Sequence, residues 1–100
     1  MSMAAWLRDG PDGAEIRRRH LAAHLEFVEA NLDTILVAGP LLDGPDGEMT
    51  GSLYVLDVAD REEAMAFLER DPYHAAGLWD EPDIRPFRGV AGRWVGGRNW

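Results

Sequence analysis

The sequence predicts an α+β domain in which an antiparallel sheet carries two helices on one face. One observation is an amphipathic helical stretch that begins near Ala14 and fades at residues 31–33. A second is a shorter helical stretch, Arg61 to Arg70. A third is a set of strand-like runs at 3–8, 34–38, 50–58 and 84–90. Together they give the order β-α-β-β-α-β, the split βαβ arrangement.

The N-terminal third predicts a strand, a turn and the long helix. Residues 3–8 form the first strand, although alanine is a weak strand former, and residues 9–13 (DGPDG) are a dense turn signal. The apolar residues of the helix recur at i, i+4, i+7 and i+11, which places them within roughly 60° of arc. This stripe is predicted to face the core, and its members are Leu21, Leu25, Val28 and Leu32.

Two strands follow the helix. The apolar run 34–38, ended by Gly39-Pro40, is predicted to be buried on both faces, and residues 41–48 are a loop or hairpin connection. In the next strand, 50–58, both sides are apolar because the side chains alternate between them. One layer of helices covers only one side of a sheet, so we expect a partner subunit on the other side.

The C-terminal part is marked by two helix caps. Asp60, with Glu63 three residues later, predicts the start of the second helix, and Asp71-Pro72 opens a further helical turn. The last strand, 84–90, contains Pro86, which is typical of an edge or a bulge. The tail 91–100 is rich in Gly and Arg, and it is either mobile or packed on a neighbouring subunit. We expect a single domain over 1–100 with a core at about 4–90.

Composition excludes several classes of function. The 18 Asp and Glu outnumber 10 basic residues, all Arg, and the net charge of −8 argues against non-specific binding to nucleic acid or to an anionic membrane. The absence of cysteine excludes disulfides, thiol nucleophiles and thiolate metal sites. No apolar run approaches the ~20 residues of a membrane span, and the start does not resemble a signal peptide. A cytoplasmic location is therefore expected.

His24 is the candidate for acid–base chemistry. It lies on the flank of the apolar stripe, with Arg17 about two turns earlier on the same flank, and imidazole is the usual proton carrier at neutral pH. A boundary histidine that only packs its ring is the alternative. His20 and His24 have the spacing of a zinc-chelating pair, but no third ligand is evident, so neither metal nor cofactor is predicted.

Several short pieces of the sequence follow one another in a characteristic order: Arg17, His24-Leu25, Ala38 to Leu41, Gly51 to Leu53, Asp71 to Tyr73, Ala76-Gly77 and Arg85 to Phe87. In these pieces the sequence resembles the YciI-like family of small proteins. The matching pieces run in family order over about residues 4–90. The family often has Arg-Pro-x-His on the first helix, and here Leu21 occupies the position three before His24. If His20 were the family's histidine, Arg17 would stand three positions before it, as in the family pattern. The spacing from His20 to Gly39-Pro40 would then exceed the more usual one, so His24 is preferred.

The resemblance implies a ferredoxin-like fold, a dimeric α+β barrel and a cleft between helices and sheet. It implies a homodimer, or a higher oligomer built from it. It also implies that His24 and Asp71 pair as an active site, although Asp before Pro is by itself a good helix cap. One related group of the family removes chloride from a chlorinated hydroxyquinol.

These observations predict a small cofactor-independent enzyme, a lyase or isomerase that acts on a small polar or aromatic substrate. A carboxylate that bonds one imidazole nitrogen fixes the tautomer and raises the basicity of the other. Arg17, Ser52 and Tyr73 are the candidate substrate-binding residues; Arg17 would hold a carboxylate or phenolate oxygen. The alternatives are a surface ion pair for Arg17 and core packing for Tyr73 and Trp79. For the whole chain, the alternative is a non-catalytic dimeric protein that binds a small metabolite or serves an accessory role.

Overall fold

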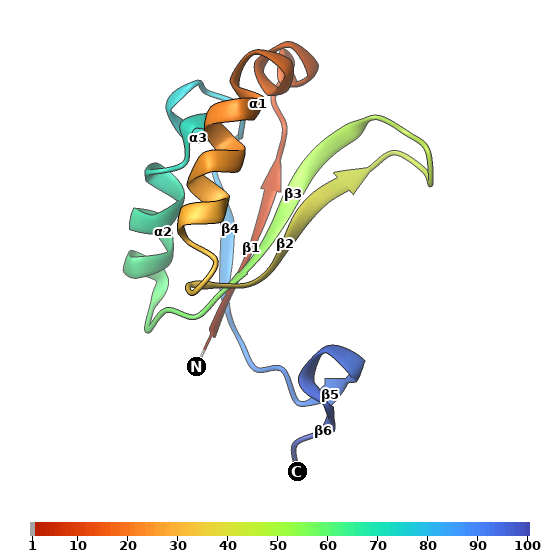
Figure 1. Cartoon of the computed structure of the whole chain (residues 1–100), viewed down its shortest axis with the longest axis vertical. Coiled ribbons are helices and arrows are strands. Elements are labelled where there is room, and N and C mark those ends of the chain that lie inside the picture. Colours follow the sequence, from red (N-terminus) through yellow and green to blue (C-terminus); the bar gives the residue numbers. More distant parts are fainter. Residues whose placement is uncertain (1) are drawn as a thin grey trace.

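The computed structural model describes residues 2–100, which form a sheet with helices on one face and a short C-terminal hairpin (Figure 1). The sheet has four antiparallel strands in the order β2-β3-β1-β4, so the predicted βαββαβ order is confirmed. The elements are β1 (Ser2–Arg8), α1 (Gly13–Ala30), β2 (Ile35–Leu42), β3 (Met49–Leu56), α2 (Arg61–Glu69), α3 (Pro72–Ala75) and β4 (Asp83–Phe87), followed by β5 (Ala91–Gly92), the 3₁₀ turn η1 (Arg93–Val95) and β6 (Gly97–Arg98).

The core lies between the two central strands and the helices. Alternate residues of β1 and β3 face the helices, as the two-residue period of a strand requires. Helix α2 closes the core with three apolar side chains that are almost fully buried. The buried cluster is Met3, Ala5, Leu7, Tyr54, Leu56, Ala64, Phe67, Leu68 and Ile84.

Helix α2 begins where the sequence predicts it. The Asp60 carboxylate accepts a hydrogen bond from the Glu63 amide at 2.8 Å, and the Glu63 carboxylate accepts one from the Ala59 amide at 2.7 Å. Two of the helix's free amide groups are thereby satisfied. The predicted cap is confirmed.

Strand β2 differs from its prediction in length and in burial. It continues through Gly39-Pro40 to Leu42, and it is not buried on both faces, since Leu36 is 59% and Leu42 46% exposed. The reason is its place at the edge of the sheet, where the β2–β3 hairpin extends beyond the helices (Figure 1). An edge strand also tolerates Pro40, which has no amide hydrogen to donate.

The sequence predicts that the apolar stripe of α1 faces the core, and this prediction is wrong. Leu21, Leu25 and Leu32 are 47%, 53% and 60% exposed. Helix α1 packs against α3. It contacts the core through Phe27, whose ring centroid lies 5.1 Å from that of Phe67. The stripe is therefore left between α1 and the β2–β3 hairpin.

Two other strand boundaries shift. The third strand spans 49–56 where 50–58 was predicted, and the last strand ends at Phe87 where Val90 was predicted. Pro86 lies in β4, an edge strand, as predicted. Across residues 2–100, no helix is long and apolar enough to cross a membrane.

Candidate active site

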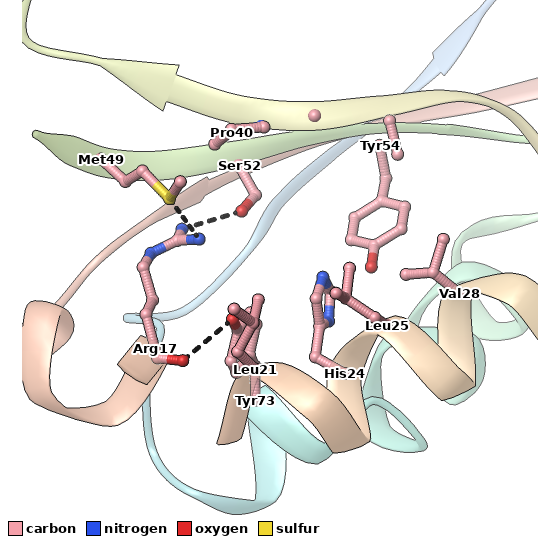
Figure 2. A pocket seen from close by; sticks show the side chains of 12 residues that line it. Arg17, Leu21, His24, Leu25, Val28, Pro40, Met49, Ser52, Tyr54 and Tyr73 are labelled. Atoms are coloured by element: carbon pink, nitrogen blue, oxygen red, sulfur yellow. Dashed lines mark hydrogen bonds between the residues drawn. The ribbon is translucent and has the colours of Figure 1, made fainter. Parts of the chain in front are cut away.

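A pocket of about 230 Å³ lies between α1 and the β2–β3 hairpin (Figure 2). Helix α1 packs against α3 and leaves this space beside the hairpin, and the exposed Leu21 and Leu25 form part of the pocket wall. Polar side chains enter it from α1, α3 and β3. Its lining residues are Arg17, Leu21, His24, Leu25, Val28, Ala38, Gly39, Pro40, Met49, Ser52, Tyr54 and Tyr73.

His24 and Asp71 are hydrogen-bonded behind the pocket. The imidazole Nδ1 lies 2.9 Å from Oδ1 and 3.0 Å from Oδ2 of the carboxylate. The Asp71 side chain is 0% exposed, whereas that of His24 is 17% exposed and lines the pocket. Because a carboxylate only accepts hydrogen bonds, Nδ1 carries the proton. In neutral imidazole this leaves the lone pair on Nε2.

Asp71 accepts two more hydrogen bonds, which hold its carboxylate in place. The Tyr73 amide donates to Oδ1 at 2.9 Å, so Asp71 is the predicted cap of α3, and the Tyr54 hydroxyl donates to Oδ2 at 2.8 Å. Burial and then the neighbouring Asp71 charge raise the pKa of Tyr54 above its ordinary value. Tyr54 therefore stays protonated and remains a donor across the physiological range.

Tyr73 holds the imidazole from the other side. Its ring stacks on that of His24 with a centroid distance of 4.0 Å and an interplanar angle of 15°. Its hydroxyl donates to the Arg17 carbonyl at 3.3 Å. Burial raises the pKa of Tyr73, and the nearby Arg17 guanidinium opposes that rise. The His24 ring is thus fixed by one hydrogen bond and one stacking contact.

Arg17 lies at the other end of the pocket in a rigid setting. Its Nε and Nη2 donate to the two oxygens of Asp9 at 2.8 and 3.0 Å, with side chains 11% and 6% exposed. Nη2 also donates to Ser52 Oγ at 3.0 Å and to the Gly51 carbonyl at 2.9 Å. Among the described residues, the one hydrogen-bond partner of Nη1 is the thioether of Met49, at 3.5 Å (Figure 2).

Gly51 is required by the close approach of β3 to β1 beside this cluster. A Cβ at position 51 would lie 2.2 Å from the Leu7 carbonyl oxygen. Only glycine fits there without a shift of the strands, and that position lets the Gly51 carbonyl meet Arg17.

The structure therefore brings the five residues predicted for the site together. Arg17, His24, Ser52 and Tyr73 line the pocket, and Asp71 lies directly behind His24. Trp79 packs against the core and does not line the pocket.

Sequence reasoning missed Asp9 and Tyr54. Asp9 lies in a run that reads as a turn, and nothing in that run indicates a buried ion pair. Tyr54 alternates with Ser52 on the helix-facing side of β3, which was a usable signal. No group of three or more His, Cys, Asp or Glu side chains that could hold a metal ion occurs within the described part of the chain.

The fold and the site together define a family, and the chain belongs to it: a YCII-related domain matches residues 1–88. Two curated relatives are the proteins YciI of Escherichia coli O6:H1 and of Shigella flexneri. Each is 31% identical over 97 residues, which cover 90% of this chain and 99% of the relative.

A solved structure is similar along nearly the whole chain. It is 5-chloro-2-hydroxyhydroquinone dehydrochlorinase from Burkholderia phenoliruptrix, in complex with 2,5-dihydroxybenzoquinone. The TM-score is 0.79 at 29% identity, and the match covers 93% of this chain and 97% of that one. The α+β fold of the chain is thus shared with an enzyme of the lyase type that holds a small quinone.

Proposed function

We propose that this protein is a small cofactor-independent enzyme, a lyase or isomerase that uses His24 as general acid and base. The observation that carries the proposal is the hydrogen bond of 2.9 Å between His24 Nδ1 and the buried Asp71 carboxylate, beside a pocket that His24 lines. This arrangement presents a basic Nε2 in a fixed orientation, which general base catalysis requires.

The proposed reaction starts with a proton transfer to Nε2. His24 removes a proton from a hydroxyl group or an acidic carbon of the substrate, and Asp71 stabilises the imidazolium that forms. The electron pair released by the C–H or O–H bond moves into the conjugated system. In an elimination it expels a leaving group as an anion; in an isomerisation the imidazolium returns the proton to another carbon.

Arg17 supplies the positive charge for such a substrate. Its guanidinium is held by Asp9, Gly51 and Ser52, so Nη1 is oriented before any ligand arrives. The Met49 thioether is a weak acceptor at 3.5 Å, and an anionic oxygen is a much better one. We propose that a phenolate or enolate oxygen displaces Met49 from Nη1 while the proton-donating atom lies at His24.

The relative with a solved structure supports a substrate class. Its name describes loss of HCl from a chlorinated trihydroxybenzene, and its ligand is a planar dihydroxyquinone. Tyr73, whose ring stacks on His24, together with Leu21, Leu25 and Val28, gives the present pocket flat and apolar walls. We propose a small planar hydroxylated ring, or a lactone or enone of similar size, as the substrate.

The experiment is a turnover screen with a matched pair of variants. Purified protein is incubated with 5-chloro-2-hydroxyhydroquinone, with related halogenated hydroquinones and with unsaturated lactones, and chloride release and ultraviolet spectra are followed. His24→Ala is expected to lower kcat/KM by about 10²–10⁴-fold. His20→Ala, four residues earlier on α1 and outside the pocket lining, is expected to leave it unchanged.

The screen also tests the non-catalytic alternative. If ring compounds raise the melting temperature but none is converted, and if His24→Ala binds them equally well, the protein is a small-metabolite-binding module. Turnover that survives in His24→Ala would overturn the role of the histidine.

We also propose that the protein acts as a homodimer. Trp6 is 51% and Phe87 45% exposed on the sheet face that the helices leave bare, and apolar area of this kind commonly marks an interface. Its cytoplasmic location stays a prediction, which fractionation of cells would test.

A further inference from the structure

Met49 lies at the cationic end of the pocket and is open to solvent. It is the first residue of β3, it is 48% exposed, and its sulfur lies 3.5 Å from Arg17 Nη1 (Figure 2). The other two methionines within residues 2–100 are Met3, which is 4% exposed in the core, and Met65, which packs against the core. Among these three thioethers, that of Met49 is therefore the most accessible to a small dissolved oxidant.

The guanidinium of Arg17 has one weakly occupied nitrogen. Nε and Nη2 donate to Asp9, and Nη2 also donates to Gly51 and Ser52, at 2.8 to 3.0 Å. Nη1 has the Met49 thioether as its hydrogen-bond partner within the described residues, and sulfur is a weak acceptor. Because the other two nitrogens are held, the guanidinium does not turn away from Met49. The chemical state of this sulfur therefore determines what Nη1 offers to a ligand.

We propose that Met49 is a modification site, and that oxidation of its sulfur to the sulfoxide blocks the anion-binding end of the pocket. The inference rests on the proposed function, in which a phenolate or enolate oxygen binds Arg17 Nη1. A sulfoxide carries a polar oxygen, and beside a guanidinium that oxygen accepts a charge-assisted hydrogen bond. A ligand must then displace a strong partner of Nη1 where it previously displaced a weak one.

The oxidant is a hydroperoxide, with hydrogen peroxide as its simplest member. A lone pair of Met49 Sδ attacks one peroxide oxygen, the S–O bond forms and the O–O bond breaks. The second oxygen takes the proton of the first and leaves as water, so sulfur loses the two electrons that the peroxide gains. Hydroquinols of the proposed substrate class supply this oxidant when they autoxidise, because each molecule reduces one dioxygen to hydrogen peroxide as it becomes a quinone.

Oxidation of Met49 is expected to change binding and to leave the acid–base pair intact. The His24 imidazole is held by Asp71 and by the ring of Tyr73, and neither contact involves Met49. The oxidised protein should therefore show a KM about tenfold higher with an unchanged kcat. Methionine sulfoxide reductases reverse this oxidation, and the exposure of Met49 gives such an enzyme access to it.

The test compares the full chain before and after limited treatment with hydrogen peroxide. Peptide mapping by mass spectrometry is expected to find an added oxygen at Met49 before any at Met3 or Met65. Nitrogen-15 NMR of the ligand-free protein is expected to show a shift of the Arg17 guanidinium signals on oxidation. Calorimetry with 2,5-dihydroxybenzoquinone, the ligand of the similar solved structure, is expected to give a Kd about tenfold higher, and reductase treatment should restore it.

Two substitutions of Met49 separate the sulfoxide from other effects of peroxide. Met49→Gln places an amide oxygen at a similar distance along the side chain, and it is expected to weaken binding without any peroxide. Met49→Leu keeps an apolar side chain of similar size, and its Kd should not respond to peroxide. Met65→Leu is the control, because Met65 lies on α2 outside the pocket lining, and this variant should keep the wild-type response.

The outcomes distinguish the modification from the proposed function. If oxidation at Met49 leaves the Arg17 signals and the Kd unchanged, or if Met49→Leu loses affinity in peroxide as the wild type does, the inference is overturned while turnover through His24 still supports the proposed function. Oxidation of Met3 or Met65 before Met49 overturns it as well. If the untreated protein neither binds nor converts any ring compound, the proposed function fails. The Arg17 signals of the ligand-free protein then decide alone, since a shift supports capture of Nη1 by the sulfoxide and no shift overturns it.

Discussion

His24 Nδ1 and Asp71 Oδ1 lie 2.9 Å apart although the two residues are 47 positions apart in the chain. The Asp71 carboxylate has two roles. It caps the short helix α3 through the Tyr73 amide, and it orients the histidine from a fully buried position. Stability and the proposed chemistry therefore depend on the same carboxylate, and substitutions can separate the two.

Asp71→Asn is expected to preserve folding while it abolishes most of the proposed activity. The amide oxygen can still accept from the Tyr73 amide, but an NH₂ group directed at His24 Nδ1 would favour the tautomer with the proton on Nε2. That tautomer cannot take a proton there, so kcat/KM should fall by about 10²–10⁴-fold. Nitrogen-15 NMR of the imidazole should show the tautomer change, and an unchanged tautomer would contradict the assignment.

Asp71→Ala is expected to destabilise the fold more than Asp60→Ala does, although both residues are helix caps. Loss of the exposed Asp60 cap should cost about 0.5–2 kcal/mol. Loss of Asp71 also leaves the buried Tyr54 hydroxyl without its acceptor, so we expect about 2–4 kcal/mol. Urea denaturation of the two variants measures the difference, and equal losses would show that the Tyr54 contact contributes little.

Arg17→Met is expected to lower stability by about 3–5 kcal/mol, because it leaves the Asp9 carboxylate buried without its cation. Arg85→Met is the matched control. It removes an ion pair with Asp83 whose side chains are 77% and 60% exposed, and such pairs contribute only about 0–1 kcal/mol. Adding Asp9→Asn to Arg17→Met should recover part of the loss, and failure to do so would argue against the buried pair.

Tyr54→Phe is expected to change the response of stability to alkaline pH. A folded-state pKa raised above the ordinary value means that the folded protein keeps the Tyr54 proton after the unfolded chain has lost it. This contribution is complete below about pH 10 and is lost as the pH rises further. Urea unfolding at pH 8–11 should show a steeper loss in the wild type than in Tyr54→Phe. Part of the loss should remain, because burial also raises the pKa of Tyr73.

Gly51→Ala is expected to cost about 1–3 kcal/mol, since the new methyl group would overlap the Leu7 carbonyl. Gly39→Ala is the control, because a Cβ there meets nothing within 4 Å and the change should stay within about 0.5 kcal/mol. Thermal melts compare the two. The displaced Gly51 carbonyl should also loosen Arg17, so ligand affinity should fall in Gly51→Ala.

Much of the fold is readable from the sequence. The turn at 9–13, the cap at Asp60, the Asp71-Pro72 start and the two-residue alternation in β3 are local signals, and each appears where it was predicted. Local signals succeed because capping, turn chemistry and strand alternation depend on residues only a few positions apart.

Tertiary structure decides which apolar side chains are buried in the core and which line a pocket or a sheet edge. The stripe of α1 predicts an apolar environment, but it does not say that the helix leans on α3 and leaves Leu21 and Leu25 to line a pocket. The run 34–38 is equally apolar whether it lies inside a sheet or at its edge, and only the strand order makes it an edge.

The order of the elements and the residue types available for the site follow from the amino-acid sequence alone. Only the folded chain decided that Asp71 receives three donors, that Arg17 is locked by Asp9, and that Tyr54 joins the site from β3. These contacts join residues that are far apart in the sequence. The hydrogen-bond partners of these residues depend on how the helices pack on the sheet, and no short-range sequence pattern predicts that packing.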